Sequence, residues 1–119
     1  MSPCEIRKGM LLEIALPPCR GGWSLAGNHP VVVVGYNKVT GELYVLAITS
    51  NAYRKEKIYF LSSDISGLRH DSYVLVGQVR CIEPTVWHRA RPLGQLPSIV
   101  TTEIEKDARR ALRQVGLAA

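Results

Sequence analysis

Residues 29 to 49 read HPVVVVGYNKVTGELYVLAIT, and this stretch decides the fold class. The four consecutive valines at 31 to 34 are a β-branched run, typical of a strand that is buried on both faces. Residues 37 to 42 contain turn-forming Asn and Gly, and the apolar pattern resumes at residues 43 to 49. The stretch therefore predicts two paired strands, residues 30 to 36 and 43 to 49, joined by a turn.

Further strands are predicted on both sides of this pair. In residues 10 to 16 apolar side chains recur at every second position, and Pro17-Pro18 then ends the strand. Residues 17 to 28 are expected to form a long loop. Residues 57 to 61 (KIYFL) predict a short edge strand, and residues 62 to 67 a loop or a single helical turn. Residues 72 to 83 (SYVLVGQVRCIE) predict a long fifth strand, in which Gly77 marks a bulge or a sharp bend.

The C-terminal segment changes to a helical period. Its apolar residues on one face are Ile104, Ala108, Ala111, Leu112 and Val115. Thr102 and Glu105 have the spacing of a capping box, and Gly116 is a stop signal. We expect one domain over residues 1–119, mainly β (α+β): a small, strongly bent sheet or partly open barrel with a C-terminal amphipathic helix packed against it.

Composition supports a single folded domain. The 119 residues are enough for one core, and no apolar run approaches the 20 residues of a membrane span. The first ten residues, MSPCEIRKGM, lack the apolar stretch of an export signal, so we expect a cytoplasmic protein without membrane contact. The net charge of +5 favours phosphates or an acidic protein partner.

The cysteines and motifs point away from metal and cofactor chemistry. Cys4, Cys19 and Cys81 are an odd number without CxxC spacing, so we interpret them as reduced thiols. The sequence has no nucleotide-binding glycine loop, zinc-ligand spacing or Gly-x-Ser-x-Gly elbow. We therefore expect no cofactor and no metal.

A few residues near the predicted strand ends could carry chemistry. If the two central strands form a hairpin, His29 and Thr49 both lie at the end away from the turn and could face one cleft; Ser50 follows Thr49, and Arg20 lies in the long loop. A histidine can transfer protons, a threonine hydroxyl can donate to an oxyanion, and an arginine can clamp a phosphate, which together suit phosphodiester chemistry. Taken singly, each has a plainer interpretation: His29 as an exposed residue where the strand begins, Thr49 as an ordinary strand residue, and Arg20 as a solvated loop residue.

The remaining aromatic and basic residues allow two interpretations. Trp23, in a polar loop, is either a stacking platform for a base or a lid over the apolar core. His88 and the nearby arginines are interpreted as a solvated basic surface, with phosphate contact as the alternative. His70 and Asp71 are interpreted as turn residues.

Motifs over residues 7 to 117 occur in an order typical of a known family. They are KGML at 8–11, the Pro-Pro and Gly-rich loop, HPVVVVGYN at 29–37, LAITS at 46–50, DSYVLVGQVRCIE at 71–83, LGQL at 93–96 and a helix ending in VGL. In these motifs the chain resembles the MazF/PemK toxins of type II toxin–antitoxin systems. The resemblance implies an SH3-like barrel, a homodimer, metal-independent cleavage of single-stranded RNA to a 2′,3′-cyclic phosphate, and a cognate antitoxin that lays a peptide over the RNA site.

The family's functional positions are only partly kept. Its threonine at the end of the third strand matches Thr49, with Ser50 following, and its fifth-strand arginine matches Arg80. Its arginine before the Pro-Val run falls on His29. The loop has Trp-Ser-Leu at 23 to 25 where the family often has Ser-Glu-Gln, and Gly77-Gln78 stands where the family often has Asp-Gln.

Two hypotheses for function follow from this resemblance. The first is an endoribonuclease, in which His29 transfers protons, Thr49 and Ser50 hydrogen-bond the scissile phosphate, and an arginine balances its charge. In this hypothesis Arg20 or Arg80 is that arginine, and the candidate RNA contacts are Trp23, Asn28, Ser50, Tyr53 and Arg80. The second is a non-catalytic relative that has lost the family's arginine and binds an RNA or a protein. A gyrase poison on a related barrel is a more distant third hypothesis.

Overall fold

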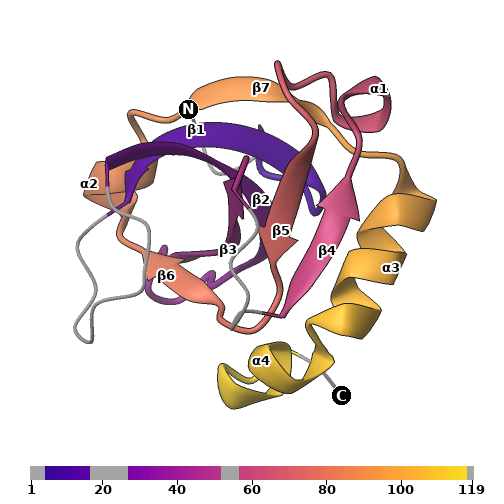
Figure 1. Ribbon diagram of the computed structural model, residues 1–119. Coiled ribbons are helices and arrows are strands. Elements are labelled where there is room, and N and C mark those ends of the chain that lie inside the picture. Colours follow the sequence, from indigo (N-terminus) through magenta and orange to yellow (C-terminus); the bar gives the residue numbers. More distant parts are fainter. Residues whose placement is uncertain (1–4, 17–26, 52–56, 118–119) are drawn as a thin grey trace.

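The computed structural model describes residues 5–16, 27–51 and 57–117 (Figure 1). Their strands are β1 (Met10–Leu16), β2 (Gly27–Tyr36), β3 (Leu43–Thr49), β4 (Ile58–Leu61), β5 (Ser72–Leu75), β6 (Arg80–Ile82) and β7 (Arg91–Gln95). Their helices are α1 (Ser63–Ser66), α2 (Pro84–Trp87), α3 (Ser98–Asp107) and α4 (Arg109–Gln114). The predicted mainly β class with a helical C-terminal segment is confirmed.

The strands form an antiparallel sheet that curls strongly on itself (Figure 1). Their order is β4-β5-β3-β2-β1-β7, and β6 pairs separately with β3. The curl makes a bent, barrel-like sheet that remains open between its two outer strands, β4 and β7, which are not paired with each other. The predicted edge position of the 57–61 segment is also confirmed, since β4 lies at one end of this order.

The β2–β3 hairpin is the centre of the sheet, as the valine run predicts. Val31 lies opposite Ala47 and Val33 opposite Val45. In the turn, the Asn37 side-chain oxygen accepts the N–H groups of Val39 and Thr40 at 2.9 and 3.1 Å, which fixes the reversal of the chain. β2 begins at residue 27, three residues earlier than predicted, because residues 27 to 29 pair with the end of β1.

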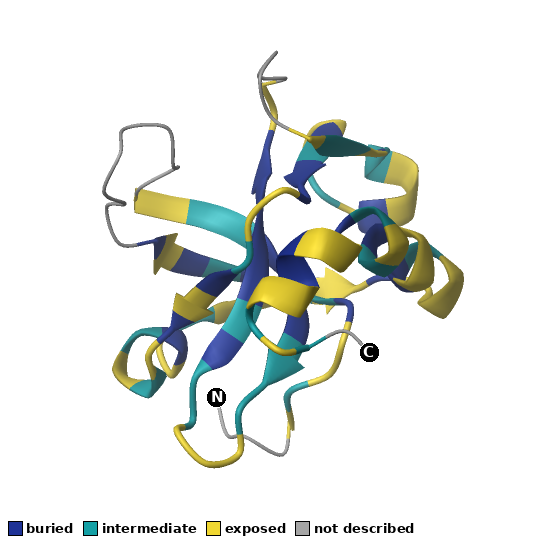
Figure 2. Cartoon of the chain, turned by 90° about the horizontal axis from the view of Figure 1, so that it is seen from below, coloured by how far each residue is buried: buried dark blue, intermediate teal, exposed yellow. Residues whose placement is uncertain are grey.

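Successive valines of β2 point into two different apolar cores. Val32 and Val34 pack on the side covered by α3 and α4, with Ile104 and Leu112 of those helices. Val31 and Val33 pack on the other side of the sheet, around fully buried Trp87 of α2. Figure 2 shows these strands as buried and much of the outer helical surface as exposed. Burial on both faces explains why the run is continuous rather than alternating.

The prediction of one long fifth strand over residues 72 to 83 is wrong, because this segment forms two strands, β5 and β6. β5 pairs with the Ile48–Thr49 end of β3 and also with β4. β6 pairs with the other end of β3, placing Ile82 opposite Leu43. Between them the chain leaves β3, and the Val76 N–H donates to the Lys57 carbonyl at 3.0 Å. The bend expected at Gly77 therefore divides the strand.

The predicted C-terminal helix is likewise two helices, which meet at Ala108. The prediction of a capping box that begins at Thr102 is wrong, because α3 starts at Ser98, directly after Pro97. Thr102 lies inside the helix, and its hydroxyl donates to the Ser98 carbonyl at 2.9 Å. Four of the five predicted apolar residues are buried, and Val115 is half-buried. Gly116 has φ +78° just after α4, which confirms it as the stop.

Two described elements were not predicted. β7 has the sequence RPLGQ, in which Pro and Gly weaken the strand signal, and it forms by pairing with β1 across a register shift between Leu11 and Leu12. α2 is a single turn that begins at Pro84. Among the described helices, none is long and apolar enough to cross a membrane.

Candidate functional site

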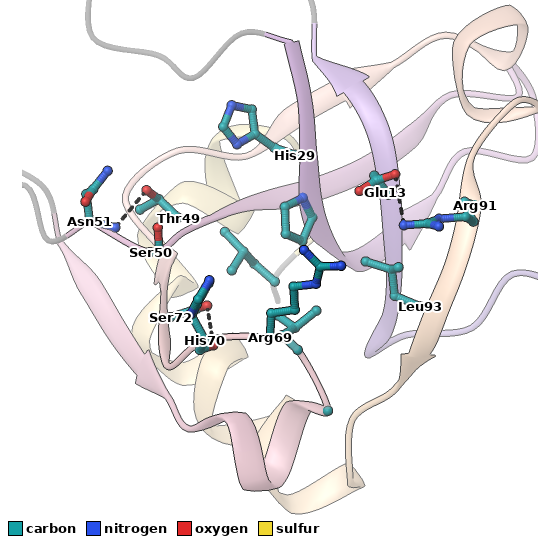
Figure 3. Close-up of a pocket in the computed structure, with 14 residues that line it drawn as sticks. Glu13, His29, Thr49, Ser50, Asn51, Arg69, His70, Ser72, Arg91 and Leu93 are labelled. Atoms are coloured by element: carbon teal, nitrogen blue, oxygen red, sulfur yellow. Dashed lines mark hydrogen bonds and ion pairs between the residues drawn. The ribbon is translucent and has the colours of Figure 1, made fainter.

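A cavity of about 580 Å³ lies at the end of the β2–β3 hairpin away from its turn. Five segments supply its polar side chains: Glu13 in β1, His29 in β2, residues 49 to 51 at the end of β3, Arg69, His70 and Ser72 where the chain enters β5, and Arg91 in β7. Leu68 and Leu93 add apolar surface. Figure 3 shows these side chains around the cavity. The curl of the sheet thus gathers polar groups from across the sequence.

The hairpin brings His29, Thr49 and Ser50 to this one cavity. His29 is half-buried and lies opposite Ile14 of β1. Thr49 is the last residue of β3, and only 6% of it is exposed. Its hydroxyl oxygen accepts the Asn51 N–H at 3.1 Å (Figure 3), which holds the side chain in place beside exposed Ser50.

Several lining residues were not singled out for the site by sequence. Arg69 and His70 reach the cavity because β5 pairs with the Thr49 end of β3. Arg91 lies there because β7 pairs with β1, and its guanidinium forms an ion pair with the Glu13 carboxylate at 3.2 Å. Both pairings join distant segments, so the sequence pattern offered no direct signal for these residues. In the part of the chain that the structure describes, no group of three or more His, Cys, Asp or Glu side chains is placed to hold a metal ion.

The comparisons with known proteins give the family. The description "PemK-like, MazF-like toxin of type II toxin-antitoxin system" matches residues 7–112. The chain belongs to this toxin family. No curated protein matches it.

Solved structures of similar fold include MazF proteins from Deinococcus radiodurans. A crystal structure of MazF (Form-I) has a TM-score of 0.70 at 24% identity, covering 89% of this chain and 94% of that one. A MazE-MazF structure (Form-III) has a TM-score of 0.63 at 24% identity, covering 93% and 96%. The part of this MazF-like chain that the structure describes therefore has the MazF fold.

The other predicted site residues of this MazF-like chain lie elsewhere or outside the description. Asn28 lines a second cavity, which shares Glu13 and Arg91 with the first. Arg80 is 8% exposed on β6, opposite Val45, and does not line the 580 Å³ cavity. The three predicted residues outside the described ranges are Arg20, Trp23 and Tyr53.

Proposed function

We propose that this MazF-like toxin is an endoribonuclease that cleaves single-stranded RNA through attack of the 2′-hydroxyl, leaving a 2′,3′-cyclic phosphate. Membership of the toxin family supports the proposal. The observation that carries it is the meeting of His29, Thr49 and Ser50 in one cavity. Because the substrate supplies its own nucleophile, the protein needs only proton transfer and stabilisation of the phosphate.

His29 accepts the proton of the attacking 2′-hydroxyl in this proposal. Histidine suits that step because it is the residue type that changes charge between pH 5 and 8, whereas arginine stays protonated.

Thr49 and Ser50 donate hydrogen bonds to the phosphate oxygens. The Thr49 oxygen already accepts the Asn51 N–H, but a hydroxyl keeps its own proton for donation. Arg69, which lines the same cavity, adds positive charge where negative charge develops. No metal or cofactor takes part in the proposed reaction.

Further contacts and partners are proposed from the resemblance and the comparisons. Arg20 is kept as a second candidate for charge balance; Trp23, Asn28, Tyr53 and Arg80 are kept as RNA contacts. Because the similar solved structures include MazE-MazF complexes, we propose a cognate antitoxin for this chain as well. A cytoplasmic homodimer completes the proposal.

A non-catalytic relative that binds RNA or protein is the second candidate. In its favour is residue 29, which is His in this sequence, whereas the resemblance implies an arginine at that position. The two candidates predict opposite results when a mixed-sequence RNA is incubated with the protein in EDTA and the product ends are mapped. The nuclease gives cyclic-phosphate ends, and the binding module leaves the RNA intact.

A pair of alanine variants then tests the site. His29→Ala should lower the cleavage rate by roughly 10²–10⁴-fold with RNA affinity nearly unchanged, as expected for loss of acid–base catalysis. His88→Ala is the matched control, because His88 stacks on Trp87 at 4.4 Å and does not line the cavity. Equal rates for both variants would remove His29 from the mechanism.

A further inference from the structure

Two imidazoles line the same cavity. His29 comes from β2, and His70 comes from the segment just before β5, 41 positions later in the chain. In the view of Figure 3, Thr49 and Ser50 lie between the two histidines. The third histidine of the sequence, His88, is stacked on Trp87 and lies outside this lining. The cavity lining therefore includes two imidazoles able to move protons, one in β2 and one in the segment that leads into β5.

Hydrogen bonds of the two residues that follow His70 hold the backbone there. The His70 carbonyl accepts the hydroxyl of Ser72 at 2.9 Å, and Ser72 is itself buried. The carboxylate of Asp71 accepts the Ser63 N–H at 2.8 Å, which ties the segment to α1. The side chain of His70 remains exposed at the cavity. Its position is thus fixed by its neighbours, while its ring is open to a ligand.

Cleavage of RNA by its own 2′-hydroxyl requires two proton transfers. The 2′-oxygen forms a bond to phosphorus while its proton goes to a base, and the bond from phosphorus to the 5′-oxygen breaks. The departing 5′-oxygen carries away the bonding electron pair and takes up a proton from an acid. Atoms and charge balance with one neutral and one protonated imidazole. One histidine supplies only half of this chemistry.

We propose that His70 is the general acid of the reaction, protonating the 5′-oxygen leaving group while His29 acts as the base. This inference rests on the proposed nuclease function and assigns a second catalytic residue to it. It also explains how a chain with histidine in place of the family's arginine can still perform both proton transfers.

The charges around the two rings set the electrostatic conditions for these transfers. Glu13, Arg69 and Arg91 line the cavity, and Asp71 adjoins His70 while accepting the Ser63 N–H. The Glu13 carboxylate forms an ion pair with Arg91. Arg69 directly precedes His70 in the sequence and is the second arginine of the lining. A bound phosphate adds negative charge between the rings, which favours the protonated form of the general acid.

A substrate with sulfur in place of the bridging 5′-oxygen tests the assignment. A thiolate leaves without protonation, so the need for a general acid disappears. His70→Ala should slow cleavage of ordinary RNA by roughly 10²–10⁴-fold and slow the sulfur substrate by less than about tenfold. His29→Ala should slow both substrates alike. His70→Gln keeps a polar side chain of similar length and should behave as His70→Ala does.

The pH dependence gives a second readout. The unmodified protein should show a bell-shaped profile, with the rising limb from the base and the falling limb from the acid. His70→Ala should lose the falling limb, whereas His88→Ala should keep the full profile.

Four results would decide against the inference. Unchanged cleavage by both His70 variants, or equal losses on the two substrates, would overturn the role of His70 and leave the nuclease function standing. Rescue of His29→Ala rather than His70→Ala by the sulfur substrate would reverse the roles and also overturn it. Absence of cleavage by the unmodified protein on either substrate would overturn the nuclease function and this inference together.

Discussion

The guanidinium of Arg91 lies 3.2 Å from the carboxylate of Glu13. Both residues line the 580 Å³ cavity and also the second cavity, which Asn28 lines. Both side chains are partly exposed, at 69% and 37%. An ion pair this exposed contributes about 0–1 kcal/mol to stability, so its main effect is on the charge of the two cavities. Glu13 neutralises a cation that would otherwise be available to a phosphate.

Glu13→Gln should therefore strengthen RNA binding. The change removes the carboxylate that pairs with Arg91 and takes one negative charge away from both cavities. The affinity for single-stranded RNA should therefore rise, and the dependence of that affinity on salt should become steeper. Thermal stability should change little. Titration of a labelled oligonucleotide at several salt concentrations measures the effect.

Glu105→Gln is the control for this change. Glu105 also forms a surface ion pair, with Lys8 at 3.4 Å, but it lines neither cavity. An equal gain in affinity for the two variants would show that total net charge, rather than Arg91, controls binding.

Thr49→Val should reduce cleavage by about 10²–10³-fold, the loss typical of one oxyanion donor. It also removes the acceptor of the Asn51 N–H and so should cost roughly 1–3 kcal/mol of unfolding free energy. Thr49→Ser keeps the hydroxyl and should retain most of the rate. Single-turnover cleavage and urea unfolding separate the two effects; a Thr49→Val protein that folds and cleaves normally would exclude a phosphate contact for this residue.

Gly9→Ala should lower the free energy of unfolding by about 2–5 kcal/mol. The backbone φ of Gly9 is +81°, and the added methyl would collide with the Thr101 hydroxyl. Gly9 also joins two elements: its N–H donates to the Val33 carbonyl and its carbonyl accepts the Leu96 N–H. Gly116→Ala is the control, since φ is +78° there with no atom near the added methyl, and should cost only about 1–2 kcal/mol. Urea midpoints that do not differ would contradict the close packing at Gly9.

The sequence predicted those parts of the fold that depend on neighbouring residues. The β2–β3 hairpin follows from a valine run, a turn and a second apolar run that are adjacent in the chain, so His29 and Thr49 could be placed together. Pairings between distant segments could not be predicted in the same way. β7 pairs with β1 although its Pro and Gly disfavour a strand, and this pairing brings Arg91 to the site.

The same limit applies to the segment before β5. Its residues His70 and Asp71 are interpreted as turn residues from the sequence, and Arg69 was not singled out at all; only the pairing of β5 with β3 shows that Arg69 and His70 line the cavity. The division of residues 72 to 83 into β5 and β6 also depends on a distant partner, the Lys57 carbonyl. The pattern of neighbouring residues therefore predicted that His29 and Thr49 lie together, but it did not predict that Arg69, His70 and Arg91 line the same cavity.

His29→Arg introduces the arginine that the resemblance to the family implies at this position, and it separates the two candidate functions. If His29 is the base, the variant should keep at most weak cleavage and lose the rising limb of the pH profile, because arginine stays protonated across the working range. The measurement is the initial rate of cleavage from pH 5 to 9 for both proteins, with His88→Arg as a control for added charge. A gain of cleavage by His29→Arg over an inert unmodified protein would instead show that the natural chain lost catalysis at this position, and the binding function would be the correct one.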